Sequence, residues 1–352
     1  MAIKITGVGS YIPTKVTPNQ AFEKSNFYNE DGSRFNADSK VIIEKFKSIT
    51  GIAERRYVED HLNNSDIGAL ASEKAIKDAN LDPEELDYII LAQNYGDVKH
   101  GSSQSDTVPS IATRVKQKLG IKNPKSVAYD VLFGCPGWIE GMIQANAFIK
   151  SGIAKKCLVI GTETLSRVVD TNDRDSMIFS DGAGAVVLEK TEGKGGILAH
   201  ESATYAYDEA RYIYFDESFN KEKTDGNRYI KMLGRKIYEF ALNNVPSAMQ
   251  TCLEKANVDI KDVKKILIHQ ANEKMDEAIV KRFYKLYGME MPEHIMPMTI
   301  ETLGNSSVAT VPTLYDLILK GKMENHSLSE GDVIIFASVG AGMNINAIVY
   351  QV

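Results

Sequence analysis

The stretch that decides the fold reads Ser126-Val-Ala-Tyr-Asp-Val-Leu-Phe-Gly-Cys-Pro-Gly-Trp-Ile-Glu-Gly141. Its apolar run from Val127 to Phe133 predicts a buried strand, and a glycine ends that run. The proline that follows Cys135 is favoured in the first turn of a helix. The apolar spacing from Trp138 to Ile149 is helical. Cys135 is therefore expected where a strand ends and a helix begins.

A cysteine in that position has a chemical use. The start of a helix carries partial positive charge and N–H groups without helical partners. Both favour the thiolate over the thiol, and the thiolate is the nucleophile. Gly134 and Gly137 leave room for a substrate beside Cys135. The alternative is a buried cysteine that packs as a small apolar side chain, and the local sequence leaves both open.

Length and composition narrow the class of protein. The chain has 352 residues, enough for about two domains, and a net charge of −6 that gives nucleic acid no basic field to bind. The N-terminus runs directly into a strand pattern, so no signal peptide is expected, and no apolar run reaches membrane-spanning length. The cysteines, at 135, 157 and 252, have no metal-ligand spacing. A reducing cytoplasm is the expected compartment.

An internal repeat organises the chain. Residues 79–93, Ala-Asn-Leu-Asp-Pro-Glu-Glu-Leu-Asp-Tyr-Ile-Ile-Leu-Ala-Gln, match residues 256–270, Ala-Asn-Val-Asp-Ile-Lys-Asp-Val-Lys-Lys-Ile-Leu-Ile-His-Gln, at an offset of 177. The same offset superposes the strand that starts at Lys156 on the one that starts at Val333. Two copies of a strand-and-helix unit predict α/β layers. We expect one half in residues 1–192 and the other in residues 193–352, with a site between them.

Two polar residues of the second half stand at the ends of predicted elements. His269 ends an apolar strand, and its repeat partner is Ala92, so the fold itself does not require a histidine there. Asn305 lies in a turn that opens into a helix, where a plain N-cap is the alternative role. The glycine-rich pieces 182–184 and 340–342 fit tight turns, and the second could also aim a backbone N–H at Cys135 as an oxyanion donor.

Taken together, three motifs resemble the β-ketoacyl-acyl-carrier-protein synthase III family. They are Phe-Gly-Cys135-Pro-Gly, Ile-His269-Gln-Ala-Asn and Gly-Asn305-Ser-Ser-Val-Ala-Thr-Val-Pro. The opening Ile-Thr-Gly-Val-Gly-Ser-Tyr-Ile-Pro and the segment Phe179-Ser-Asp-Gly-Ala-Gly-Ala are similar to the same family. The resemblance implies the thiolase fold, which has five layers, αβαβα, built from two similar halves. It also implies a homodimer.

The resemblance further implies a decarboxylating Claisen condensation. Cys135 would take an acyl group from a thioester. His269 and Asn305 would hydrogen-bond the thioester carbonyl of a malonyl-acyl-carrier protein and stabilise the enolate as carbon dioxide leaves. The backbone N–H groups of Cys135 and Ala341 would form the oxyanion hole. The resemblance implies no metal and no bound cofactor, with coenzyme A or acyl-carrier-protein thioesters as the substrates.

Substrate contacts are assigned by the same resemblance to four residues, Val108, Arg174, Lys274 and Gly340. Val108 stands where relatives place a phenylalanine that closes the partner's acyl pocket, so a longer or branched acyl group is expected. Lys45 and Ile49 replace residues that face the adenine of coenzyme A, and Glu239 replaces a basic residue that docks the carrier protein. An insert at about 205–228 could cover the entrance, and the polar insert 96–106 could reshape the acyl pocket.

Three other classes of protein match the sequence less well than the synthase III family. Type III polyketide synthases also use Cys, His and Asn, but a different sequence follows their histidine. Thiolases carry a second cysteine where this chain has Ala341-Gly-Met-Asn, and hydroxymethylglutaryl-type synthases need a glutamate where this chain has Gln93-Asn94. A non-catalytic partner subunit usually loses the cysteine, which is present here.

Overall fold

A computed structural model describes residues 2–224 and 226–352. Two sheets dominate it, and they are joined edge to edge by the parallel pairing of Ile3 with Gly196. The first sheet has the strand order β5 (Val127–Val131), β4 (Tyr88–Ala92), β6 (Lys156–Thr164), β7 (Asp181–Thr191) and β1 (Ala2–Tyr11). The second continues with β8 (Gly196–Thr204), β13 (Asn344–Gln351), β12 (Val333–Gly340) and β11 (Val263–Ile268).

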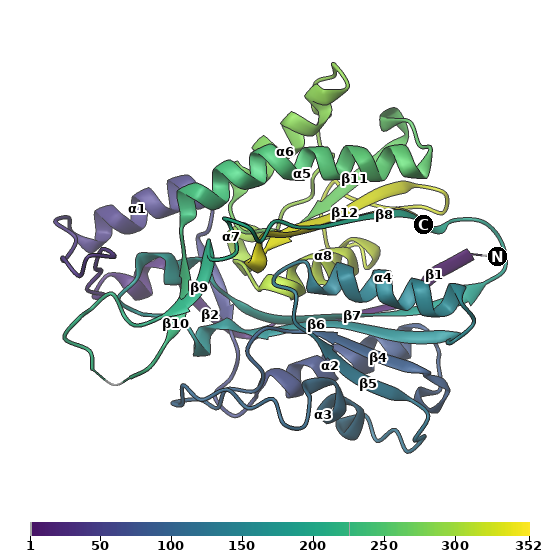
Figure 1. The fold of residues 1–352 in the computed structure, drawn as a ribbon, viewed down its shortest axis with the longest axis horizontal. Helices are drawn as coiled ribbons and strands as arrows, with labels where there is room; N and C mark the ends of the chain where they lie inside the picture. The colour runs from purple at the N-terminus through teal and green to yellow at the C-terminus, as the bar shows by residue number, and fades with distance from the viewer. Residues whose placement is uncertain (1, 225) are drawn as a thin grey trace.

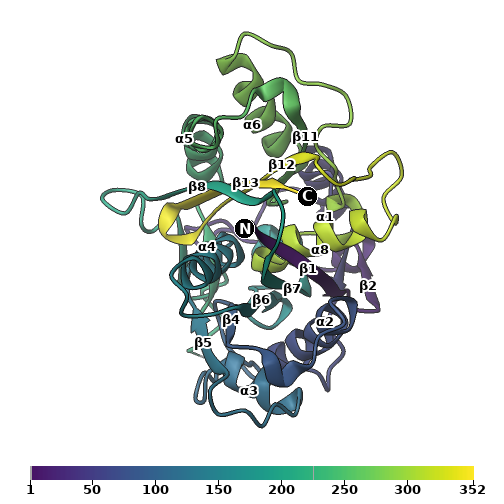
Figure 2. The ribbon, with the colours of Figure 1, turned by 90° about the vertical axis from the view of Figure 1, so that its right-hand side faces the viewer.

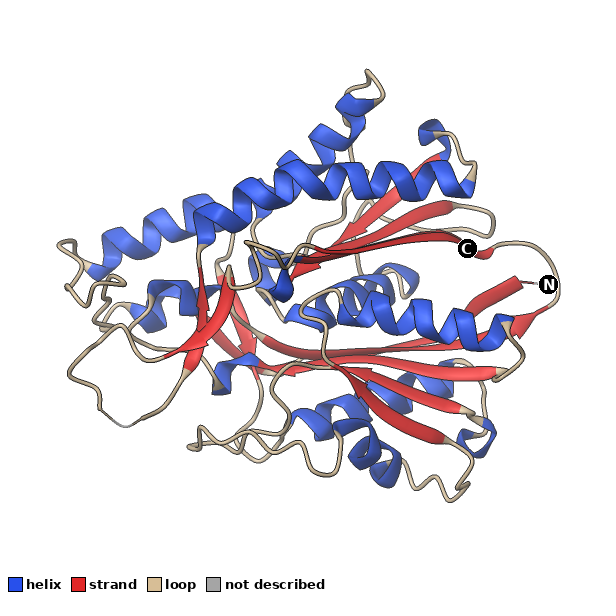
Figure 3. Ribbon diagram, in the orientation of Figure 1, coloured by secondary structure: helices blue, strands red, loops and turns tan. Residues whose placement is uncertain are grey.

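Helices complete five layers, as Figures 1 and 3 show. The outer helices on the first sheet are α2 (Asn64–Asp78) and α3 (Ile111–Lys118), and those on the second are α5 (Gly234–Ala256) and α6 (Glu273–Leu286). The middle layer holds α4 (Gly137–Lys150) and α8 (Thr310–Leu319), which lie between the sheets in both views (Figure 2). The predicted αβαβα thiolase fold is confirmed.

Smaller elements gather at one end of the layers. They are α1 (Ser39–Thr50), α7 (Ile300–Leu303), the pair β2 (Lys15–Pro18) and β3 (Glu54–Tyr57), and the pair β9 (Ile213–Asp216) and β10 (Tyr229–Met232). The β9–β10 hairpin is fastened by Lys231, which is fully buried and pairs with Asp170 at 2.6 Å and Asp173 at 3.2 Å. None of the helices in the described residues is long and apolar enough to cross a membrane.

The internal repeat extends to strand register. Tyr88 pairs with Cys157 in the first sheet, and the positions 177 residues later, Lys265 and Ile334, pair in the second. Asn80 and Asn257 share a left-handed backbone, with φ of 50° and 53°. A shorter similarity, between 180–184 and 338–342, has no such equivalence, because the first segment opens β7 and the second closes β12.

One local prediction needs correction, and two helix starts are defined by their caps. The strand after Ser126 is not buried, because β5 is the edge of its sheet and leaves Val127 45% exposed, and it ends at Val131. The capping residue of α2 is Asn63, because Asn63 and Asp66 form a reciprocal capping box. Helix α3 begins at Ile111, after Val108 and Pro109, because Ser110 caps it by accepting from the Thr113 N–H.

The middle helix α4 explains why its sequence is apolar on almost every side. It lies between two sheets, so Trp138 is 1% exposed and Met142 is fully buried. The Trp138 ring packs edge-on against Phe336 of β12, with centroids 5.6 Å apart. Packing from both sheets holds α4, and therefore Cys135 just before it, in a fixed place.

Candidate active site

One cavity of about 60 Å³ brings the predicted residues of both halves together. Its polar lining includes Cys135, His269, Asn305 and Ser307, and Ala341 lies beside them. Its apolar lining comes from both sheets and from the β9–β10 hairpin, and includes Leu165, Phe179, Ile213, Ile230, Met232, Ile237, Ala271, Met275 and Val339. A reactive polar end therefore opens onto an apolar chamber, an arrangement suited to an acyl chain.

Cys135 lies in the turn between β5 and α4, as predicted, and Pro136 is the N-cap of α4, one position before its first turn. Two glycines allow β12 to approach this turn. A Cβ atom at Gly340 would lie 2.5 Å from the backbone nitrogen of Cys135. At Gly134, which has a φ of 66°, a Cβ atom would lie 2.6 Å from the Ala341 nitrogen. The glycines thus bring the backbones of Cys135 and Ala341 close together.

The ionisation of Cys135 reflects opposing effects. Burial raises the pKa of its thiol to about 11, while a hydrogen bond that the Ser307 hydroxyl donates to the sulfur at 3.3 Å acts to lower it. The charge of Glu163 acts in the same direction as burial. The thiol is therefore the resting form, and the helix start alone does not ionise it as the sequence suggested.

His269 follows the last residue of β11, and its N–H donates to the Ala337 carbonyl at 2.8 Å. Its Nδ1 lies 2.7 Å from the Thr310 hydroxyl, which leaves Nε2 for the cavity. Burial lowers the pKa of His269 to about 4, so the imidazole is neutral near pH 7. A neutral imidazole can donate one hydrogen bond and accept another.

Asn305 is 3% exposed and lies in the turn before α8, whose N-cap is Ala309, so the plain N-cap role considered for Asn305 is wrong. Its Oδ1 accepts from the Ser307 N–H at 2.8 Å, a bond within the turn. Its backbone exchanges hydrogen bonds with the first half, donating to the Ile178 carbonyl at 3.0 Å and accepting from the Ser180 N–H at 2.8 Å. Because the turn bond uses the amide oxygen, the amide NH₂ group is the part of Asn305 suited to donate into the cavity.

Four polar side chains around this site were not predicted: Asn94, Glu163, Ser307 and Thr310. Glu163 lies near the end of β6, and its carboxylate accepts from the Asn94 side-chain amide at 2.7 Å. Burial raises the pKa of Glu163 to about 8. The available signal was a glutamate closing an otherwise apolar strand, Cys157-Leu-Val-Ile-Gly-Thr-Glu163. A charged residue in such a strand is costly unless it has partners.

The remaining substrate predictions lie outside this cavity. Val108 is 85% exposed and does not line it. Arg174 is half exposed, pairs with Asp175 at 3.6 Å and covers the Phe35 ring, while Lys274 is exposed in the first turn of α6. Gly340 does not line the cavity either, but it lies against the backbone of Cys135. Lys45 and Ile49 are on exposed positions of α1, and Glu239 pairs with Arg235 on α5.

The insert predicted at 205–228 contains β9, and one of its residues reaches the cavity. Ile213 lines the apolar chamber, and Phe215 stacks on Tyr95, with ring centroids 5.3 Å apart. Tyr95, which follows β4, lines the same chamber and begins the polar loop that leads to Asp106. Asp225 of the insert lies outside the described residues.

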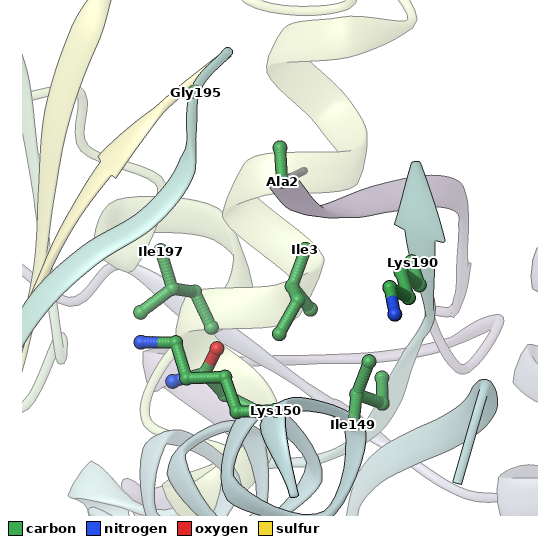
Figure 4. A pocket seen from close by; sticks show the side chains of 8 residues that line it. Ala2, Ile3, Ile149, Lys150, Lys190, Gly195 and Ile197 are labelled. Atoms are coloured by element: carbon green, nitrogen blue, oxygen red, sulfur yellow. The ribbon is translucent and has the colours of Figure 1, made fainter. Parts of the chain in front are cut away.

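A second cavity, of about 250 Å³, lies at the C-terminal end of α4 (Figure 4). Ile3, Ile149 and Ile197 line it, with Lys150 and Lys190 beside them. Since α4 has 14 residues, this cavity is roughly 20 Å from Cys135. None of the three motifs contributes to its lining. Among the described residues, no group of three or more His, Cys, Asp or Glu could hold a metal ion.

Comparisons with known proteins agree with the geometry. A family model described as 3-oxoacyl-[acyl-carrier-protein] synthase III matches residues 129–206, and its C-terminal counterpart matches residues 253–352. The β-ketoacyl-[acyl-carrier-protein] synthase III of Ruegeria pomeroyi is 32% identical over 99% of this chain and 98% of that protein. The corresponding protein of Bacillus pumilus is 33% identical over 98% of this chain and 97% of its own.

Solved structures give the same picture. The 3-oxoacyl-[acyl-carrier-protein] synthase III of Aquifex aeolicus has a TM-score of 0.82 and 31% identity, with all of both chains covered. The priming β-ketosynthase of the R1128 polyketide pathway also has a TM-score of 0.82, at 24% identity, over 99% of this chain and 96% of that one. At that identity the second likeness concerns the fold alone.

Proposed function

The chain belongs to the 3-oxoacyl-[acyl-carrier-protein] synthase III family, and from this premise we propose that it is a condensing acyltransferase. It moves an acyl group onto Cys135 and then joins that group to a malonyl unit on an acyl carrier protein, which loses carbon dioxide. The product is a β-ketoacyl thioester, in fatty-acid initiation or a related specialised pathway. The observation that carries this proposal is the single cavity that contains Cys135, His269, Asn305 and Ala341.

In the first step the Cys135 sulfur attacks the carbonyl carbon of an acyl thioester. A bond forms between Sγ and that carbon, the thioester C–S bond breaks, and the thiol proton leaves with the departing thiolate. The Ser307 hydroxyl, 3.3 Å from Sγ, stabilises the sulfur anion as it forms. The backbone N–H groups of Cys135 and Ala341, brought together by Gly134 and Gly340, receive the oxyanion.

In the second step the malonyl thioester loses carbon dioxide and its carbonyl oxygen becomes an enolate. His269 Nε2–H and the Asn305 NH₂ group donate to that oxygen. Nε2 can donate only if Nδ1 accepts from Thr310, so the Thr310 hydroxyl must turn from the Ser307 carbonyl, 3.0 Å away, toward Nδ1. The enolate carbon then attacks the acyl-cysteine, a carbon–carbon bond forms, and the Cys135 thiolate leaves.

The surroundings of the cavity suggest how substrates and partners bind. The apolar chamber would hold the acyl chain, and exposed Lys274 and Arg174 would meet the negatively charged carrier protein or coenzyme A outside it. Val108, which is 85% exposed and lies just before α3, would close the chamber of the other subunit in a homodimer. The reaction needs no bound cofactor. We assign the two halves to residues 1–192 and 193–352, and the compartment to the cytoplasm, in keeping with three free cysteines.

Intact-mass spectrometry tests the proposal. The purified protein is incubated with a panel of acyl-coenzyme A and acyl-carrier-protein thioesters, from acetyl to longer and branched chains. We expect a mass gain of one acyl group, lost in Cys135→Ala and retained in Cys252→Ala, which removes a buried cysteine of α5. Adding malonyl-acyl-carrier protein should then release the acyl group as product. Undiminished product formation by Cys135→Ala would refute the assignment.

A further inference from the structure

A directed series of hydrogen bonds links a buried carboxyl group to the Cys135 sulfur. The Asn94 side-chain amide donates to Glu163 Oε2 at 2.7 Å and to Ser307 Oγ at 3.4 Å. Because Ser307 Oγ receives that hydrogen, its own proton is free to point elsewhere, and it donates to Cys135 Sγ at 3.3 Å. The series joins Glu163 on β6, Asn94 after β4 and Ser307 before α8, three elements that are distant in sequence.

Ser307 is held in this orientation at some cost in backbone strain. It has a positive φ of 52°, uncommon for a residue other than glycine. The Asn305 Oδ1 atom fixes its N–H, and its carbonyl accepts from Thr310 at 3.0 Å. Such strain persists only where the surroundings determine it, and it is found most often at functional sites. Glu163 in turn fixes the Asn94 amide, because a carboxyl oxygen without a proton can only accept, so the NH₂ side of that amide must face it.

We propose that Glu163 is a positioning residue for the Cys135 nucleophile. Through Asn94 it orients the Ser307 hydroxyl toward the sulfur, and the charge on its own carboxyl group limits how readily the thiol ionises. This inference rests on the proposed role of Cys135 as the nucleophile. Glu163 does not touch the substrate, and it lies on β6, the strand equivalent to β12, which ends at Gly340 and leads into Ala341.

Several other titratable groups lie near Glu163 and Cys135. His269 shares the cavity with Cys135, and its burial keeps it neutral near pH 7. The pKa of Tyr95 is raised by burial first and then by the charges of Glu163 and Cys135. Asp181 on β7 adds to the rise in the pKa of Glu163, which burial dominates and brings to about 8. Glu163 therefore gains its charge as the pH rises through about 8, and that charge opposes ionisation of the thiol.

The rate of alkylation of Cys135 by iodoacetamide, followed by mass spectrometry from pH 6.5 to 9.5, measures thiolate without any thioester substrate. We expect Glu163→Gln to react at the wild-type rate near pH 7 and about fivefold faster at pH 9.5, because a tenfold change in thiolate corresponds to one pKa unit. Ser307→Ala should react roughly fivefold more slowly across the whole range. Asn94→Ala should resemble Ser307→Ala, and the double variant should be no slower than either single one.

Glu189→Gln is the matched control. It removes a carboxylate on the neighbouring strand β7 that pairs with Lys156 at 3.4 Å. The ratio of its alkylation rate to the wild-type rate should not change with pH. The proposed series of hydrogen bonds, the relay from Glu163 to Cys135, would be overturned by either of two results. One is a rate ratio of Glu163→Gln to wild type that does not change with pH, and the other is a wild-type rate for Asn94→Ala. If Glu163→Gln fails to fold, as judged by thermal unfolding, Asn94→Ala and Ser307→Ala still decide the matter. Labelling that persists unchanged in Cys135→Ala would overturn the nucleophile assignment and the relay together.

Discussion

At the ends of β4 and β11 the two halves of the molecule carry Ala92 and His269, which the 177-residue offset makes equivalent. Ala92 is fully buried and packs against α4, where a Cβ atom at Gly137 would lie 3.0 Å from its own Cβ. His269 lines the cavity and is fixed by Thr310. The next residues, Gln93 and Gln270, are both buried glutamines. Gln93 accepts from the Gly96 N–H in the loop that follows it, and Gln270 donates to the Pro297 carbonyl.

The neighbouring strands show the same contrast. At the offset positions near the ends of β6 and β12 stand Glu163 and Gly340. Gly340 lets the β12 backbone touch Cys135, and Glu163 binds the Asn94 amide. The duplicated scaffold therefore supplies two pairs of equivalent strand ends near one cavity, and single residues at those ends determine what each contributes. Scaffold and chemistry should be separable by mutation.

The largest expected effect comes from making the second half resemble the first. His269→Ala places alanine at both equivalent positions, and it should lower the condensation rate by about 10²- to 10³-fold, because one donor to the developing enolate is lost. Acylation of Cys135 should persist, since it precedes the enolate. Single-turnover assays with acyl and malonyl thioesters separate the two steps. Equal losses in both would mean that His269 serves the cysteine, and a loss of the folded state would mean that the scaffold requires it.

Opposite pH dependence of stability should distinguish Glu163 from His269. The pKa of Glu163 is raised to about 8 by burial, so its contribution to stability is full below about 4.5 and is lost as the pH rises through about 8. The pKa of His269 is lowered to about 4, so its contribution is full above about 6.5 and is lost as the pH falls through about 4. The two slopes oppose each other between those limits.

Denaturant unfolding of Glu163→Gln and His269→Gln at several pH values measures both slopes. Relative to wild type, Glu163→Gln should gain on the order of 2–3 kcal/mol between pH 5 and 7, at roughly 1.4 kcal/mol per pH unit. His269→Gln should change by a similar amount in the opposite direction, and gain as the pH falls from 6.5 to 4.5. Glu189→Gln should show little change. Parallel slopes for the first two variants would contradict the protonation states assigned to them.

The sequence predicted the scaffold better than the support of the site. A single sequence is enough to show three features: the repeat, the strand-to-helix junction at Cys135 and the strand end at His269. Each of them is visible as a pattern of residues along the chain. The edge position of β5 could not be predicted. The run from Val127 to Phe133 is mostly apolar, and such a run does not show whether a further strand pairs with its other side. Glu163, Asn94 and Ser307 meet only through folding, since they belong to three separate elements. No local spacing could reveal that contact.

The smallest effect tests whether the scaffold itself is symmetrical. Asn80 and Asn257, at equivalent helix ends, are both exposed and both left-handed, and their N–H groups donate to Lys77 and Glu254 at 3.1 and 3.0 Å. Alanine at either position should cost about 1 kcal/mol of unfolding free energy, because a Cβ atom disfavours that backbone region, whereas glycine should cost only a few tenths. The two alanine effects should be equal and additive, since the sites are far apart. A cost confined to one half would show that the repeated backbone no longer contributes equally, even where sequence and register still match.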